Sequence, residues 1–169
     1  ITNKYANMKK IFVLLFVFSL SVVSANAQFE EGKKYVGASL SGLDMNYSGN
    51  GKFSLGIEGK AGYFFNDNLM LLAEAGYDHQ GNRDNGDAIH VGVGGRYYIT
   101  QNGIFLGANC KLMHFDHNYN DFMPGVEVGY AFFINHSVTI EPSLYYQQSF
   151  KNHSDFSTIG FKVGFGIYL

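Results

Sequence analysis

The sequence predicts an all-β fold, an eight-stranded antiparallel up-and-down transmembrane β-barrel preceded by a cleavable signal peptide. Three observations predict it. Apolar and polar residues alternate with a period of two, which is the side-chain period of a strand. Glycine and aromatic residues are abundant, with 21 Gly, 16 Phe and 12 Tyr, as in outer-membrane barrels. The chain also starts with a segment that resembles an export signal.

The N-terminal segment is expected to lie outside the fold. Met8-Lys9-Lys10 is basic, residues 11–23 form an apolar run, and Ala25-Asn26-Ala27 is a small-x-small cleavage site. We therefore expect cleavage after Ala27 and a mature chain that begins at Gln28. An uncleaved anchor is disfavoured because the run is shorter than the about 20 residues of a spanning helix. The expected division is 1–7 upstream residues, 8–27 signal peptide and 28–169 outer-membrane β-barrel.

The alternation defines eight strands. It is clearest in residues 159–169, where Ile, Phe, Val and Leu occupy one face and glycines, Lys162 and Tyr168 occupy the other. Each segment is long enough to cross a bilayer when tilted. The predicted strands are 34–48, 53–65, 69–80, 88–100, 104–116, 122–134, 137–150 and 158–169.

The connections alternate in character. Three are tight turns of residues that tolerate positive φ: Asn66-Asp67-Asn68, Gln101-Asn102-Gly103 and Asn135-His136. The others, near residues 49–52, 81–87, 117–121 and 151–157, are polar and longer. Short turns on one side and longer loops on the other are typical of the periplasmic and outer ends of a membrane barrel.

Glu74 interrupts the apolar segment Leu69-Met70-Leu71-Leu72-Ala73, and its position follows from the two faces of the strand. It shares a face with Gly76 and Asp78, opposite Leu71, Ala73 and Tyr77, so it is expected to point into the barrel. Sorting every strand in this way gives four inward acids and four inward bases. The expected inward structural charge network is Glu58, Lys60, Glu74, Arg96, Lys111, Glu127, Glu141 and Lys162.

Such an interior predicts a filled lumen. An eight-stranded barrel is only wide enough for its own side chains, and unpaired buried charges are unfavourable. We therefore expect paired charges inside, with inward glycines relieving the crowding.

The alternative is a soluble barrel with the apolar face inside. Two observations disfavour it: glycines concentrate on the polar face, and aromatic residues cluster at the strand ends as interfacial girdles do. One predicted girdle is Tyr63, Phe65, Tyr97, Tyr130, Phe132 and Tyr168, and the other is Tyr47, Tyr77, Phe115, Phe122 and Tyr146.

Repeated hairpins carry a family resemblance. Gly62-Tyr63, Arg96-Tyr97 and Gly129-Tyr130 recur at similar spacing, and the chain ends in the alternating strand Gly160-Phe161-Lys162-Val163-Gly164-Phe165-Gly166-Ile167-Tyr168-Leu169. With the signal peptide, these features resemble the small eight-stranded outer-membrane barrels: the OmpA transmembrane domain, OmpX and porin-family relatives. The resemblance covers the mature chain and implies a role in envelope integrity, adhesion or host contact, sometimes with weak pore activity. The last strand resembles the signal read by the barrel-assembly machinery, although it ends in Leu169 rather than an aromatic residue.

Five histidines fall toward the outer ends of the strands: His79, His90, His114, His117 and His153. Histidines can bind zinc or copper or change charge in mildly acidic surroundings. His114 and His117, however, are three apart on a strand and point to opposite faces, so we expect polar loop residues and no metal or cofactor. Cys110 is expected to face lipid as a small apolar residue.

Catalysis is disfavoured. Some barrels of this size modify lipid A through a triad of His, Ser and an acid that faces the bilayer. His136-Ser137 lies at a predicted periplasmic turn and His153-Ser154 in a polar loop, and neither has a visible acidic partner. We therefore expect no enzyme activity.

Charge and location limit the partners. Removing residues 1–27 changes the formal charge from −2 to −5, which argues against nucleic acid as a partner. The expected partners are outer-membrane lipid or lipopolysaccharide, the barrel-assembly machinery during insertion, and a host or envelope protein. The expected function is structural or surface-interacting: envelope integrity, adhesion, or an accessory subunit in the outer membrane. A narrow pore is the main alternative, followed by a lipid A-modifying enzyme and a soluble ligand-binding barrel.

Overall fold

A computed structural model describes residues 29–46, 51–52, 54–80, 87–99, 102–115, 119–150 and 157–169. These residues form eight long strands and two strands of two residues. The long strands are β1 (Lys34–Asn46), β3 (Ser54–Asn66), β4 (Leu69–Gln80), β5 (Ala88–Tyr98), β6 (Ile104–Phe115), β7 (Tyr119–Tyr130), β9 (Val138–Gln147) and β10 (Thr158–Tyr168). The short ones are β2 (Gly51–Lys52) and β8 (Phe132–Phe133).

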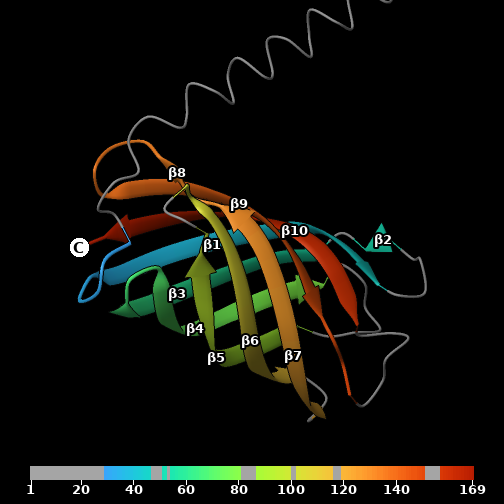
Figure 1. The fold of residues 1–169 in the computed structure, drawn as a ribbon. Coiled ribbons are helices and arrows are strands. Elements are labelled where there is room, and N and C mark those ends of the chain that lie inside the picture. Colours follow the sequence, from blue (N-terminus) through green and yellow to red (C-terminus); the bar gives the residue numbers. More distant parts are fainter. Residues whose placement is uncertain are drawn as a thin grey trace, which may run out of the picture.

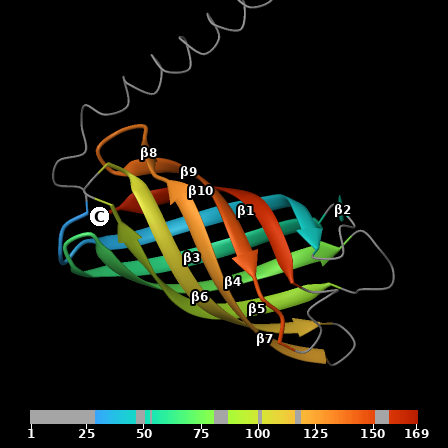
Figure 2. The ribbon, with the colours of Figure 1, turned by 45° about the vertical axis from the view of Figure 1, so that its right-hand side comes forward.

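The strands close into a barrel (Figures 1 and 2). Each long strand pairs antiparallel with its neighbours in sequence, and β1 pairs with β10 from Tyr35↔Tyr168 to Asn46↔Thr158. Because the first and last strands pair, the long strands leave no open edge between them, as expected of an up-and-down barrel. The predicted fold class is confirmed; the predicted signal peptide lies outside the described residues. No described segment forms a helix long and apolar enough to cross a membrane.

The two ends of the barrel differ. The turn end carries residues 29–33, the three short connections and Leu169; the loop end carries the other connections. At the turn end, Asn68 has a φ of 64°, the left-handed conformation expected of a tight-turn asparagine. The predicted two-residue turn Asn135-His136 is wrong in length. Residues 134–137 link β8 to β9, and the Asn135 side chain accepts hydrogen bonds from the backbone N–H groups of Ser137 (2.9 Å) and Val138 (2.8 Å).

The predicted strand 122–134 is also divided. β7 ends at Tyr130, and the Ala131 N–H donates to the Gly103 carbonyl (2.7 Å) instead of to a neighbour in β9. The same register resumes in β8, where Phe132 pairs with Ile140. The other predicted strands agree with the observed ones to within a few residues.

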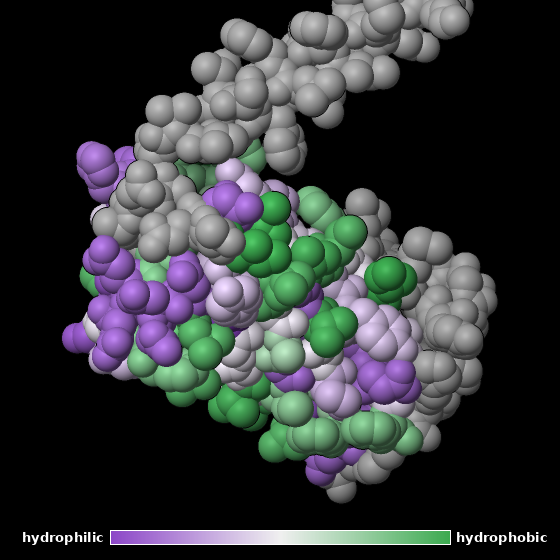
Figure 3. All heavy atoms as spheres, in the orientation of Figure 1, coloured by the Kyte–Doolittle hydropathy of each residue, from purple (hydrophilic) through white to green (hydrophobic). Residues whose placement is uncertain are grey.

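Side chains sort to the two sides of the barrel wall as predicted. Outward positions carry the apolar set, with Leu71 57%, Ile89 58% and Val93 66% exposed. Inward positions carry the charged set and most glycines, so the soluble alternative with an apolar interior is wrong. Figure 3 shows apolar residues along the wall and hydrophilic residues gathered at the turn end. One predicted girdle residue is misplaced: Tyr168 is 3% exposed and lies inside the barrel. Tyr47 and the side chain of Phe115 are outside the described part.

Candidate functional site

The interior of the barrel holds all eight residues of the predicted charge network. They come from β3, β4, β5, β6, β7, β9 and β10, and none is more than 9% exposed. Strand alternation turns each of them inward, while cross-strand register brings acids and bases together. Lys60, for example, pairs with Glu74 on the neighbouring strand.

Lys60 and Lys162 lie among the acids in the middle of this interior charge network. Lys60 Nζ is 3.1 Å from Glu58, 3.8 Å from Glu74 and 3.7 Å from Glu127. Lys162 Nζ reaches two of these three acids, Glu127 at 2.7 Å and Glu58 at 3.5 Å. Lys111 completes it with a short contact to Glu58 and a longer one to Glu74. Since Glu58, Glu74 and Glu127 each face more than one base, no single ion pair holds this part of the network together.

Arg96 links this network to the turn end. Its Nε donates to Glu127 (2.6 Å) and its Nη1 to Glu141 (2.7 Å), and its guanidinium lies 4.1 Å from the Phe105 ring centroid. Glu141 also accepts hydrogen bonds from the hydroxyls of Tyr35 (2.9 Å), Tyr168 (2.9 Å) and Thr139 (2.8 Å). Charge-assisted bonds of this kind satisfy a carboxylate that burial has deprived of water.

Toward the loop end, His90 joins the network, which corrects the expectation of a polar loop histidine. It is 3% exposed, and its two ring nitrogens face two carboxylates: Nε2 lies 3.2 Å from Glu58 and Nδ1 lies 3.0 Å from Asp78. Strand alternation places His90 on the inward face of β5 with Arg96, but its partners come from β3 and β4 through the register.

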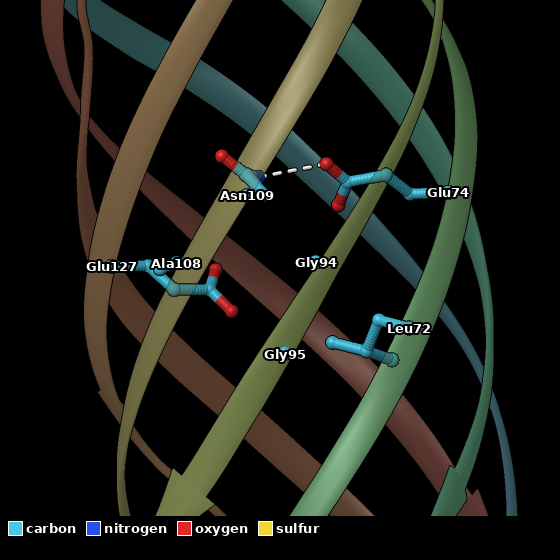
Figure 4. Close-up of a pocket in the computed structure, with 7 residues that line it drawn as sticks. All are labelled: Leu72, Glu74, Gly94, Gly95, Ala108, Asn109 and Glu127. Carbon is cyan, nitrogen blue, oxygen red and sulfur yellow. Dashed lines mark hydrogen bonds between the residues drawn. The ribbon is translucent and has the colours of Figure 1, made fainter.

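Amides extend the network on the other side of the lumen. Asn109 Nδ2 donates to Glu74 (2.7 Å), and Gln147 Nε2 donates to the Asn109 oxygen (3.0 Å). Between Glu74 and Glu127 lies a cavity of about 10 Å³, lined also by Leu72, Gly94, Gly95, Ala108 and Asn109 (Figure 4). A volume of this size holds about one water molecule.

Two inward glycines make room for these side chains. A Cβ on Gly107 would lie 2.5 Å from the Glu127 side chain, and one on Gly166 would lie 2.6 Å from both Glu141 and Thr139. These separations are shorter than carbon and oxygen atoms tolerate, so any other residue at these positions would displace a carboxylate. The predicted relief of crowding by glycine therefore has a specific geometry here.

A cluster that the sequence did not predict closes the turn end. Phe29 precedes β1, is fully buried, and stacks on Tyr98 with ring centroids 4.0 Å apart. Its backbone carbonyl accepts a hydrogen bond from the Asn68 N–H (2.7 Å), which holds the segment across the barrel mouth. The turn-end aromatic cluster consists of Phe29, Tyr35, Phe64, Tyr98, Phe105, Phe133 and Tyr168.

Residues 11–169 match the family model described as outer membrane protein beta-barrel domain. The chain belongs to this family. No curated protein sequence matches it. Solved structures share the fold: the N-terminal β-barrel domain of OprF from Pseudomonas aeruginosa has a TM-score of 0.63 at 13% identity, over 82% of this chain and 98% of that one. Neisserial surface protein A has a TM-score of 0.58 at 13% identity, over 81% of this chain and 97% of that one. Ail, the attachment invasion locus protein of Yersinia pestis, has a TM-score of 0.52 at 15% identity, over 82% of this chain and 99% of that one.

This membership makes the chain an integral outer-membrane β-barrel. Its outward apolar residues are therefore the surface that faces lipid. Cys110 lies on that surface, exposed between Ala108 and Leu112, as predicted. At the low identities above, the solved structures show the fold alone.

The other histidines of this outer-membrane barrel lie apart from the network. His79 is exposed and its Nδ1 is 2.7 Å from Asp87; His114 is exposed and its Nδ1 is 2.6 Å from Asn120. His117 and His153 lie outside the described residues. Within the described ranges, no group of three or more His, Cys, Asp or Glu side chains could hold a metal ion. The interior fills the described part of the lumen with ion pairs, because each of the buried bases Lys60, Arg96, Lys111 and Lys162 faces an acid.

Proposed function

We propose that this barrel is a closed membrane anchor that acts through contact at the cell surface and does not conduct ions. The observation that carries the proposal is the filled lumen. The interior charge network spans the middle of the barrel, and the aromatic cluster with Phe29 covers the turn end. The cavity beside Glu74, within this described part of the lumen, has room for about one water molecule.

In this proposal the turn end faces the periplasm and the loop end faces outward, as in other barrels of the outer membrane. The role is structural or interactive: envelope integrity, adhesion, or an accessory subunit of an outer-membrane complex. The proposed partners are the surrounding lipid or lipopolysaccharide, the barrel-assembly machinery, which would read the last strand, and a host or envelope protein at the loop end.

The proposal includes cleavage after Ala27. Phe29 supports it, because this buried ring lies in the barrel mouth only two residues after the cleavage site. We also propose that the barrel is not an enzyme. Support comes from His136 and Ser137, which lie in the turn-end connection, where a periplasm-facing pair could not reach lipid of the outer leaflet.

The test is planar-bilayer conductance of the refolded mature barrel. A closed anchor predicts no unitary current steps, while a reference channel added afterwards to the same membrane shows that insertion and recording work. Barrel insertion is confirmed on the same sample by the mobility shift between boiled and unboiled protein. Reproducible current steps from folded barrel would favour the narrow pore and refute the closed anchor.

A further inference from the structure

A row of polar side chains ends the outward face of four neighbouring strands at the loop end. On each strand the apolar surface stops and the next described outward residue is polar. On β4, Tyr77 is followed by His79, and on β6, Leu112 is followed by His114. The polar row consists of His79, Asp87, His114 and Asn120.

The row is built from two cross-strand pairs of the same design. His79 Nδ1 lies 2.7 Å from Asp87 Oδ1, and His114 Nδ1 lies 2.6 Å from the side-chain oxygen of Asn120, its register partner. Carboxylate and amide oxygens accept hydrogen bonds, so each imidazole donates its Nδ1–H. The Tyr77 hydroxyl donates to the second oxygen of Asp87, which fixes this carboxylate from both sides.

This arrangement leaves the Nε2 atom of each of the two imidazole rings available to a ligand. With the proton on Nδ1, the Nε2 atom of a neutral imidazole is a hydrogen-bond acceptor. Hydroxyl groups can donate to it, whereas a phosphate oxygen, itself an acceptor, cannot. A polyhydroxylated ligand therefore fits two such rings better than a phosphate does.

Apolar surface adjoins the row and continues toward the middle of the barrel wall. Ile89 is the register partner of both Tyr77 and His114, and it is 58% exposed. Below it, Val91 and Leu112 are 54% and 58% exposed on the surface that faces lipid. Tyr77, 43% exposed, offers a ring face beside the polar atoms. A molecule that spans both parts would need a hydroxylated headgroup and hydrocarbon chains.

We propose that the polar row binds the saccharide headgroup of an outer-membrane glycolipid, whose acyl chains lie on the apolar surface below. The sugar hydroxyls donate to the two Nε2 atoms, and Tyr77 contacts a sugar ring. The site lies outside the barrel and does not require a closed lumen, so it can fail while the closed anchor stands, and the reverse.

Native mass spectrometry of the folded barrel released from mixed detergent micelles tests the proposal. The probes are a diglucosyl diacylglycerol and a phosphatidylcholine with identical acyl chains; the phosphatidylcholine headgroup has a phosphate but no hydroxyl that could donate. We expect the wild-type barrel to retain the glycolipid about tenfold more than the phospholipid, and His79→Ala/His114→Ala to lose most of this preference, since two hydrogen bonds correspond to about tenfold in affinity. The matched control is His136→Ala, an exposed histidine at the turn end, which should bind like wild type.

Equal retention of the two lipids by the wild type, an unchanged preference in the double variant, or an equal loss in His136→Ala would each overturn the proposal. Boiled and unboiled samples establish that each variant is folded. If the double variant does not fold, Asp87→Ala replaces it, because it keeps both histidines and releases the orientation of His79 and of the Tyr77 hydroxyl. Asp87→Ala should lose part of the preference for the glycolipid. An Asp87→Ala barrel that keeps the whole preference would also overturn the proposal.

Discussion

The middle of the barrel and its turn end fill the same lumen with opposite kinds of side chain. The interior charge network holds eight ionic side chains, which burial destabilises unless every one is paired. The turn-end aromatic cluster holds phenyl and phenol rings, whose burial is favourable by itself. The two regions should therefore respond differently to substitution. The stability of a buried charge depends on all its partners together, whereas the stability contributed by a ring depends on the volume that it fills.

The two regions meet at Arg96 and Glu141. Arg96 pairs with Glu127 and Glu141, and its guanidinium faces the Phe105 ring. Glu141 in turn accepts from Tyr35 and Tyr168 of the aromatic cluster. The phenol hydroxyls therefore complete the hydrogen bonding of the last acid, and each region satisfies groups of the other.

Removal of Arg96 is expected to have the largest effect. Arg96→Ala leaves Glu127 and Glu141 buried with fewer partners, and breaking a buried pair in this way costs about 4 kcal/mol of unfolding free energy. Urea unfolding of the barrel in lipid vesicles, followed by the loss of the heat-modifiable gel band, measures it. Arg96→Lys is the control that keeps a charge. A loss below about 1 kcal/mol would mean that the network contributes little, since exposed pairs lie in that range.

Removal of the Phe29 ring is expected to have the second largest effect on stability. Phe29→Ala leaves a cavity among Tyr98, Phe64 and Tyr168 and should lower the unfolding free energy by about 3 kcal/mol, as for other buried Phe residues. Phe65→Ala, which truncates an outward ring 44% exposed, is the matched control and should change stability much less. Equal effects of the two variants in the same urea experiment would show that Phe29 does not close the barrel mouth.

A double replacement sharpens the contrast between the regions. In Arg96→Met/Glu141→Gln the buried base and one of its acids become neutral together, so fewer unpaired charges remain than in Arg96→Ala. We expect a loss of about 2 kcal/mol, smaller than for the single variant although two residues change. Losses that simply add, with the double variant less stable than Arg96→Ala, would contradict the description of the network as mutually dependent.

Much of the fold could be predicted because strand alternation has a period of two and leaves few choices. The facing of Glu74, Lys111 and Val93 follows directly from it. The partners of His90 could not be predicted, since they depend on the register of β3 against β4 and of β4 against β5. Tyr168 has the inward parity of its strand, yet its aromatic character and end position suggested a girdle; the barrel closes so that β10 brings its ring under Phe29.

Phe29 itself carries no signal in the sequence. It lies outside every alternating segment, one residue after the expected mature start, and only the three-dimensional mouth of the barrel shows that a ring is needed there. The histidine pairs of the loop end were unpredictable for a similar reason. His114 and Asn120 are separated by a connection, and their hydrogen bond depends on the β6–β7 register.

The closed lumen is tested most directly by thiol labelling inside the barrel. Ser143 points inward from β9 and is 4% exposed. The lipid-facing thiol of Cys110 can first be removed by Cys110→Ala, which should change the free energy of unfolding by about 0.5 kcal/mol or less. In that background, Ser143→Cys is treated with a membrane-impermeant maleimide, and Asn102→Cys at the exposed turn end serves as the reactive control. A filled lumen predicts rapid labelling at position 102 and none at position 143 until the barrel is unfolded by heat. Labelling of position 143 in the folded barrel would show that water reaches the middle of the lumen and would contradict the closed anchor.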